Sequence, residues 1–218
     1  MSTFPRSPQI VRGGIALLDP DTGVVTRLIS FQYNPETLTR TLQMQGPQGE
    51  GDRFETFRFK GPPVETIKLE AEIDASDQLE FPAQNKNAVS NGIQPQLTAL
   101  EMILYPASGQ LQQASQLAAA GTMEIFPATG PLPLFIWSRN RVVPVRITEF
   151  SITEESFDSA LNPTRAKVSL GMRVLTISDV DFSSKAGSLA MIHHQRKEQL
   201  SNLLPSATLA RFGLQNLP

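Results

Sequence analysis

The side chains that most often carry chemistry are few in this chain and poorly spaced for it. His193 and His194 are the only histidines. Adjacent helical residues point about 100° apart, so these two cannot share one metal ion as a pair four residues apart does. Glu154, Glu155 and Asp158 form an acidic group, but they lie where an expected strand ends beside a turn, and no Asp-x-Asp-x-Asp-Gly calcium loop is present. We therefore expect a partly exposed surface histidine pair and no catalytic or metal site.

Sequence motifs for nucleophilic catalysis and phosphate binding are also absent. The chain has no Gly-x-Ser-x-Gly elbow, no GxxxxGK[ST] segment and no GxGxxG segment. It has no cysteine, which excludes disulfides, thiolate metal sites and a cysteine nucleophile. We expect a structural or interaction protein with no bound cofactor, not an enzyme.

The overall charge and hydropathy narrow the class of partner. A net charge of -2 over 218 residues gives no electrostatic footprint for nucleic acid or an acidic membrane. No apolar run approaches the roughly 20 residues that cross a bilayer, and the first residues, MSTFPRSPQI, lack the apolar core of a signal peptide. We expect cytoplasmic assembly, no nucleic acid partner and no direct membrane insertion. The 17 prolines, 14 glycines and 18% charged residues are typical of a β-rich, loop-rich domain.

The longest regular pattern lies between residues 141 and 177, and it predicts two long strands joined by an irregular connection. Apolar and polar side chains alternate along the second strand, which indicates one buried and one polar face. The buried set is Ala166, Val168, Leu170, Met172 and Val174, and the polar set is Arg165, Lys167, Ser169, Gly171 and Arg173. About 12 residues at roughly 3.3 Å each reach about 40 Å, which is long for a small domain. Either a neighbouring subunit completes this hairpin or it is a long hairpin within one sandwich; periodicity leaves both open.

The rest of the chain predicts a hairpin, a clean strand and several helices around that element. The predicted organisation is a flexible arm at 1–9, a β domain at 10–178 with a helical insertion at about 93–121, and a C-terminal helix and tail at 179–218. Turn residues at Asp19–Gly23 predict a hairpin, and Val64–Asp74 alternates as a strand with one buried face.

Helix signals are uneven. Residues 79–92 look polar and irregular, whereas residues 94–105 show an apolar stripe with a proline near the first turn. Residues 110–120 are compatible with either a low-charge helix or an irregular insertion. Ser184 is expected to cap a helix that runs to about Leu204.

Two motifs resemble a known family. The segment Phe31-Gln-Tyr-Asn-Pro-Glu-Thr-Leu38 resembles the F-x-[FY]-N-P-x-x-L segment near the start of the baseplate tube-adaptor proteins of contractile injection systems. The stretch from Phe135-Ile-Trp137 through 145–152 to FDSALNPTRAKV at 157–168 is similar to the family's tryptophan, strand, F-x-x-D/N-G-x-P-x-R-A-x-V segment and final strand. Both motifs occur in the family's order, over roughly residues 10–178.

The resemblance implies a mainly β fold with flanking helices: a tail-tube-like β-sandwich or partial barrel whose long hairpins contribute to a ring barrel. It implies a homohexamer in a phage-tail-like particle, linking the spike hub to the inner tube, with baseplate wedge proteins as further partners. The positions that match motif residues are implied to be structural or interface residues: Asn34, Pro35, Trp137, Pro163, Arg165 and Ala166. In such a ring, Lys167, Ser169 and Arg173 would face the central channel.

The chain departs from the family pattern in two places. Many relatives continue into a LysM domain, whereas the residues after 178 look like a helix and a tail. We therefore expect that this domain is missing here or that another subunit supplies its function. Where relatives have glycine before the motif's proline, this chain has Leu161-Asn162. We expect Asn162 to take the positive φ that glycine would adopt.

The alternative function is a monomeric β-sandwich binding module, for example one that binds carbohydrate. Such modules display a platform of exposed aromatic side chains. This chain has only one tryptophan and two tyrosines. We expect Trp137 and Tyr33 on buried strand positions, which favours the ring subunit over the binding module.

Overall fold

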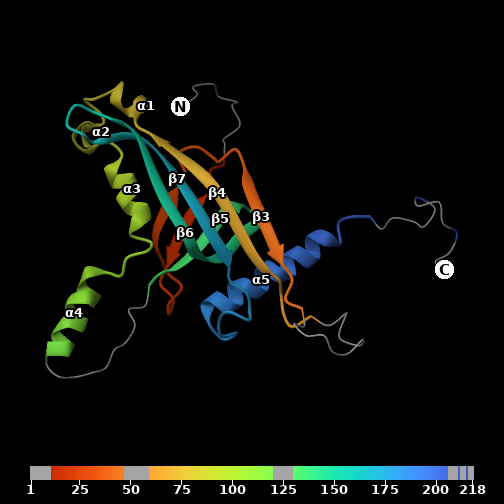
Figure 1. The fold of residues 1–218 in the computed structure, drawn as a ribbon. Coiled ribbons are helices and arrows are strands. Elements are labelled where there is room, and N and C mark those ends of the chain that lie inside the picture. The colour runs from red at the N-terminus through yellow and green to blue at the C-terminus, as the bar shows by residue number, and fades with distance from the viewer. Residues whose placement is uncertain (1–10, 47–58, 120–129, 206–210, 212–214, 216–218) are drawn as a thin grey trace.

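The computed structural model describes residues 11–46, 59–119, 130–205, 211 and 215. Within these ranges the chain forms strands and helices in the order drawn in Figure 1. The strands are β1 (Gly14–Leu18), β2 (Val25–Ser30), β3 (Leu38–Gln43), β4 (Val64–Asp74), β5 (Leu132–Ser138), β6 (Arg141–Phe157) and β7 (Pro163–Val174). The helices are α1 (Ser76–Leu79), α2 (Lys86–Asn91), α3 (Gln94–Glu101), α4 (Ser108–Ala119) and α5 (Lys185–Ser201). The predicted arm at 1–9 lies outside the described residues.

The described strands form one antiparallel sheet that is not closed into a barrel. Its order is β2-β1-β5-β6-β7-β4-β3. The strand β6 belongs to both halves, because Arg141–Pro144 pair with β5 and the residues from Val145 to Phe157 pair with β7. The sheet therefore consists of a β2-β1-β5 half and a β6-β7-β4-β3 half that share one long strand. The expectation of a mainly β fold with flanking helices is confirmed.

The core lies between the two halves of the sheet. One cluster of buried side chains combines Ile15 and Phe135 from the first half with Ile67 and Leu170 from the second. Leu97 and Leu100 of α3 join the same cluster. A second cluster lies on the other face of β1 and β5, where it contacts Leu189 of α5. Because both faces of β1 are covered, all five of its residues are buried, in contrast to the alternating strands of the second half.

The two clean alternations of the sequence are confirmed. The strand β4 has the predicted bounds, Val64–Asp74, and its odd-numbered residues from Glu65 to Ile73 are buried. The predicted buried set of β7 is fully enclosed: Ala166 0%, Val168 0%, Leu170 1%, Met172 0% and Val174 2% exposed. The turn at Asp19–Gly23 is also confirmed, since Asp19 Oδ1 accepts from Thr22 N at 2.8 Å and Gly23 has a φ of 70°.

The helical insertion is longer than the sequence predicted. It begins with α1 and continues with α2, which lies in the stretch 79–92 that the sequence predicts to be irregular. The helix α3 ends at Glu101 and not at residue 105. The stretch left open at 110–120 lies in or just after α4. The cap of α5 is confirmed, because Ser184 Oγ accepts a hydrogen bond from Gly187 N at 3.0 Å. Neither α1 nor α2 has a side-chain cap, which removes the usual sequence signal for a helix start.

The connection between β6 and β7 is a tight turn built on an aspartate. Asp158 Oδ1 accepts from Ala160 N and from Asn162 N, each at 2.8 Å. The expectation that Asn162 takes a positive φ is wrong, because Leu161 takes it, at 64°. Asn162 instead donates its side-chain amide to Asp158 at 2.9 Å. A left-handed leucine that is 80% exposed is a local strain that no packing offsets.

Leu161→Gly should therefore raise the stability of the fold. Relief of the left-handed strain outweighs the extra freedom of glycine in the unfolded chain, so we expect a gain of about 0.5 to 1 kcal/mol. Urea unfolding monitored by circular dichroism measures it. Ala160→Gly, at the preceding position with its negative φ, is the control and should lower stability slightly. Equal losses in both variants would contradict the strain.

The assigned faces of β7 lead to a second prediction. Leu170→Asp places an unpaired carboxylate in the core and should cost more than about 4 kcal/mol, enough to unfold most of the protein. Lys167→Glu changes charge on the exposed face of the same strand and should leave the fold intact. The two variants are compared by solubility and thermal unfolding. A cooperative, native-like transition for Leu170→Asp would show that the faces are misassigned.

Candidate functional site

The most distinctive surface of the molecule is the polar face of the β3-β4-β7-β6 unit, opposite the core. Its charges are arranged in rows across the strands, because residues paired in register point to the same side. One row joins Thr41 of β3, Thr66 of β4, Arg173 of β7 and Arg146 of β6. Lys167 and Ser169, expected to share a face with Arg173, lie on this surface, half exposed. This surface is called the polar face below.

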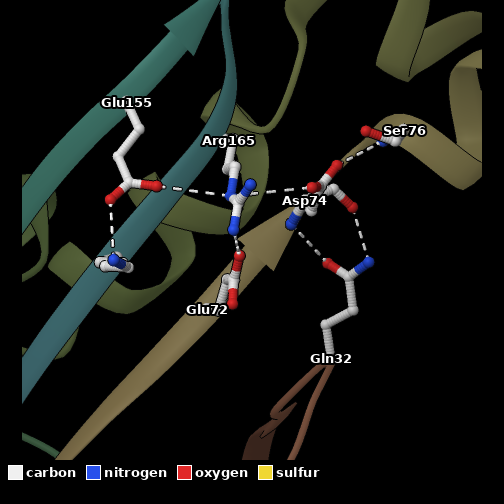
Figure 2. Close-up of polar contacts among 7 residues, drawn as sticks. Gln32, Glu72, Asp74, Ser76, Glu155 and Arg165 are labelled. Atoms are coloured by element: carbon white, nitrogen blue, oxygen red, sulfur yellow. Dashed lines mark hydrogen bonds and ion pairs between the residues drawn. The ribbon is translucent and has the colours of Figure 1, made fainter.

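Arg165 is the centre of the charge network at one end of the polar face. Its guanidinium pairs with Glu72 of β4, with Glu155 of β6 at 3.3 Å and with Asp74 at 3.9 Å. Figure 2 shows the three carboxylates arranged around this one side chain. The hydrogen bond that Arg165 donates to Glu72 and the neighbouring negative charges raise the pKa of Arg165. One cation thus ties together three neighbouring strands.

Three other cations of the polar face are also paired with carboxylates. Lys167 lies 3.0 Å from Glu155, whose hydrogen bond and charge raise the lysine pKa. Lys68 pairs with Glu149 at 2.7 Å across β4 and β6. Arg173 pairs with Asp179, just beyond β7. These three cations are therefore neutralised locally by acidic neighbours.

The β6-β7-β4-β3 unit has a free backbone edge on each side. On one side, β6 pairs with β5 only as far as Pro144, so the strand from Val145 to Phe157 has β7 as its one partner among the described strands. On the other side, β3 pairs with β4 alone in the same part of the chain. Both edges carry backbone groups able to pair with a further strand.

A glutamine side chain covers the end of β4 beyond β3. Gln32 Nε2 donates to the carbonyl of Asp74 at 2.6 Å, and Asp74 N donates to Gln32 Oε1 at 3.0 Å. The amide therefore contacts both backbone groups of one residue, as a neighbouring strand would (Figure 2). The hydrogen bond from Ser76 lowers the pKa of the Asp74 carboxyl, despite partial burial.

The motif residues near the start of the chain lie together at the β1 end of the first half. Asn34 accepts from Gly13 N and donates to the carbonyl of Val11, both at 2.9 Å, and thereby holds the strand that leads into β1. Pro35, next to it, is buried. Trp137 lies partly buried against the core and stacks on Phe135 with the ring centres 6.0 Å apart.

The motif residues of the second half lie at the base of the β6-β7 turn. The carbonyl of Pro163 accepts from Ile93 N at 2.8 Å, which joins β7 to the start of α3. Gly92 has a φ of 56°, and a Cβ there would lie 2.0 Å from that carbonyl, so only glycine fits. Ala166 is fully buried in the core. The structure thus separates the six motif positions into two regions on different halves.

Tyr33 does not occupy the buried strand position expected for it. It is 46% exposed, because β2 ends at Ser30 and Tyr33 lies beyond the strand. Trp137 is partly buried, as described above. The aromatic argument against a binding module therefore holds for the tryptophan and fails for the tyrosine.

A buried ion cluster that sequence reasoning missed fastens α5 to the sheet. Glu65 occupies a core-side position of β4, yet its side chain is only 5% exposed and pairs with Arg40 of β3 at 2.7 Å and with Lys197 of α5. Burial raises the carboxyl pKa, but the bonds and charges of Lys197 and Arg40 outweigh it and lower the pKa overall. The sequence offered one sign of this cluster: Glu65 falls on the side of β4 whose other residues are apolar.

His193 of α5 lies beside this cluster and is partly buried. Its Nε2 atom is buried and has no hydrogen-bond partner, whereas His194 is exposed and lies 3.3 Å from Glu198. Burial, together with the positive charges of Lys197, Arg40 and Arg141, lowers the pKa of His193 to about 4, against the opposing effect of Glu65. The imidazole is neutral at physiological pH.

Comparison with known proteins identifies no family for this chain. No protein-family model matches the chain, and no curated protein matches it significantly. Among the residues that the structure describes, no three histidine, aspartate or glutamate side chains are grouped to hold a metal ion. None of the helices in those same ranges combines the length and apolar character needed to span a membrane.

The His193 environment predicts an acid-dependent loss of stability. The folded pKa is about 4, below the roughly 6.5 of an unfolded histidine. The unfolded chain therefore binds this proton first, and stability falls as pH decreases from about 6.5 to 4. Between pH 7.5 and 4.5 the loss due to His193 should be about 1 to 2 kcal/mol after solvent screening.

Urea titrations of the wild type and of His193→Gln at both pH values measure this difference. The variant should lose less stability on acidification by that amount. His194→Gln, at the exposed neighbour, is the matched control and should keep the wild-type dependence. Identical pH profiles for all three proteins would contradict the burial of His193.

Proposed function

We propose that this protein is a structural ring subunit of a contractile injection system baseplate, in which it links the spike hub to the inner tube. The observation that carries the proposal is the pair of free edges on the β3-β4-β7-β6 unit. The type of particle and the number of six copies are taken from the sequence resemblance. The proposal assigns the protein no catalytic step and no cofactor.

The two free edges have the right sense to pair with each other. Neighbouring strands in the unit are antiparallel, so β3 and β6, at its two ends, run in opposite directions. A β6 edge placed against the β3 edge of a second copy therefore continues the antiparallel pattern. Repetition of that step produces either a closed ring or an open helix, depending on the rotation between copies.

Ring closure would also remove an exposed backbone liability. A free edge of about 13 residues from Val145 to Phe157 would extend roughly 40 Å. Soluble proteins usually protect such edges with proline, bulges or a covering segment. Proline is absent from 145–157, although register shifts occur near Glu149 and Ser156. Pairing between copies satisfies the remaining groups.

The polar face is the side of the unit that would line the channel. The opposite face packs on β1, β5 and α3 and is unavailable. Six copies of the four-strand unit give about 24 strands, and a spacing of roughly 4.8 Å gives a ring about 37 Å across between backbones. Lys167, Ser169 and Arg173 would then face the channel, together with their acidic neighbours.

The pairing of charges gives such a channel a mixed lining. Lys167 and Arg173 each have an acidic partner, so neither sign dominates around them. A lining of this kind has little affinity for a highly charged segment of either sign, because its ions are already neutralised locally. The channel would suit passage or support of a folded inner component, not retention of nucleic acid.

Cysteine cross-linking tests the ring directly, because the chain has no cysteine of its own. Thr41→Cys on the β3 edge is combined in one chain with Arg146→Cys, Ser151→Cys or Thr153→Cys on the β6 edge, which covers three registers. Under mild oxidation we expect one combination to give a ladder that ends at six copies. Thr22→Cys, in the β1–β2 turn, replaces the β6 cysteine in the control.

Electron microscopy of the cross-linked sample should show closed rings with an open centre. Genes for sheath, tube, spike and an AAA-type ATPase beside this one would be expected for the particle. The ring proposal would be contradicted if the protein stays monomeric at about 1 mM and no register gives more cross-linking than the Thr22→Cys control. Rings formed by a protein whose gene lacks these neighbours would support the ring assembly but contradict the assignment to a contractile injection system.

A further inference from the structure

The helix α4 is not covered by any other part of the chain that the structure describes. It has 12 residues, and none of them is buried. Its sequence, SGQLQQASQLAA, contains no charged residue. Leu111 and Leu117 are 53% and 41% exposed. In Figure 1, α4 extends away from the sheet at the end of the helical insertion.

Such a helix gains little stability by itself. Twelve residues form a helix about 18 Å long, and isolated helices of that length are marginal in water. An exposed helix that is stable in solution usually carries charged pairs, which α4 lacks. Its apolar residues Leu111, Ala114, Leu117 and Ala118 fall within about 120° on one side. This side has the character of a packing face without a partner.

An apolar groove of matching character lies between β3 and α5. It encloses about 220 Å³ and is lined largely by apolar side chains, with Glu65 of β4 and His193, His194 and Lys197 of α5 completing the lining. Those used here are Leu42 of β3, Pro62 and Pro63 before β4, Ile177 after β7 and Met191 of α5. Leu42 is 52% exposed and Ile177 is 40% exposed. This is called the β3–α5 groove below.

The helix and the groove lie at opposite edges of one unit and at the same level. Ile103 and Leu104, just before α4, line a hollow together with Arg146 and Ile147 of β6, so α4 departs from beside the β6 edge. Arg146 is in the cross-strand row that ends at Thr41 of β3. Leu42, in the groove, is the next residue.

We propose that α4 of one copy packs in the β3–α5 groove of the adjoining copy. The proposal rests on the ring proposed above, since pairing of β6 with a second copy's β3 brings the two ends of that row together. A helix about 18 Å long tolerates a shift of several residues in the strand register. The contact uses different surfaces on the two copies, which is the type that generates rings.

The chemistry of the two surfaces fits a second copy of this chain. The uncharged helix brings no charge of its own into the groove, where Glu65 and Lys197 are already paired with each other. Burial of Leu111 and Leu117 in one copy and of Leu42 and Ile177 in the other removes exposed apolar surface from both. The occupant is thus α4 itself, held in place by the strand pairing next to it.

Mixed single-cysteine proteins test the contact without ambiguity about chain identity. One copy carries Leu111→Cys or Leu117→Cys, and the other carries Leu42→Cys or Ile177→Cys. We expect oxidation to give a mixed dimer in yields at least fivefold above those of the control, in which Gln116→Cys on the opposite side of α4 replaces the helix cysteine. Equal yields with Gln116→Cys would overturn the contact.

The strand-edge cysteine variants are oxidised in parallel at the same protein concentration, which separates the two proposals. Edge cross-links without helix–groove cross-links would leave the ring standing and overturn the α4 contact. Helix–groove cross-links without edge cross-links would retain the α4 contact and overturn the continuous sheet. Absence of both at about 1 mM would overturn both.

A charge variant gives an independent readout. Leu111→Asp combined with Leu117→Asp should weaken self-association at least tenfold by sedimentation, with an unchanged circular dichroism spectrum, because α4 is exposed in the single copy. Gln112→Asp combined with Gln116→Asp is the matched control on the opposite side and should weaken it less than threefold. Equal effects of the two pairs would also overturn the contact.

Discussion

The need of β6 for backbone partners governs the architecture of this chain. Its first residues, up to Pro144, pair with β5, and the rest pair with β7. One strand thereby holds the two halves of the sheet and positions them to enclose the core. The same strand continues beyond the reach of β5, which leaves one side of it without a partner in the described chain. Core formation and the free edge are therefore two consequences of a single long strand.

The polar interactions divide into those that order the fold and those that arrange its surface. The buried Glu65 pairs with Arg40 and Lys197, and so it joins β3, β4 and α5 at a position where an apolar residue would give no direction to the helix. Arg165 does the same for β4, β6 and β7, but on an exposed face where solvent weakens each pair. The first cluster fixes the placement of an element, whereas the second mainly sets the sign pattern of a surface.

Local patterns predicted the fold well wherever one side of an element is buried. The alternation in β4 and β7 and the serine cap of α5 were found because each signal lies within a few residues. The Glu65 cluster was missed because its partners lie 25 and 132 residues away in the chain. The short helices α1 and α2 were missed because they lack side-chain caps. The positive φ falls on Leu161 and not on Asn162, because the backbone N–H of Asn162 is bonded to Asp158. The position of α4 had no local signal at all.

The amide of Gln32 has a consequence for how this sheet can grow. It occupies the pairing groups of Asp74 at the end of β4, where β3 no longer covers that strand. A foreign polypeptide that approached this residue would have to displace two satisfied bonds and would regain no more than it broke. The Gln32 side chain therefore blocks strand addition at this end of β4. Extension of the sheet on this side is confined to β3.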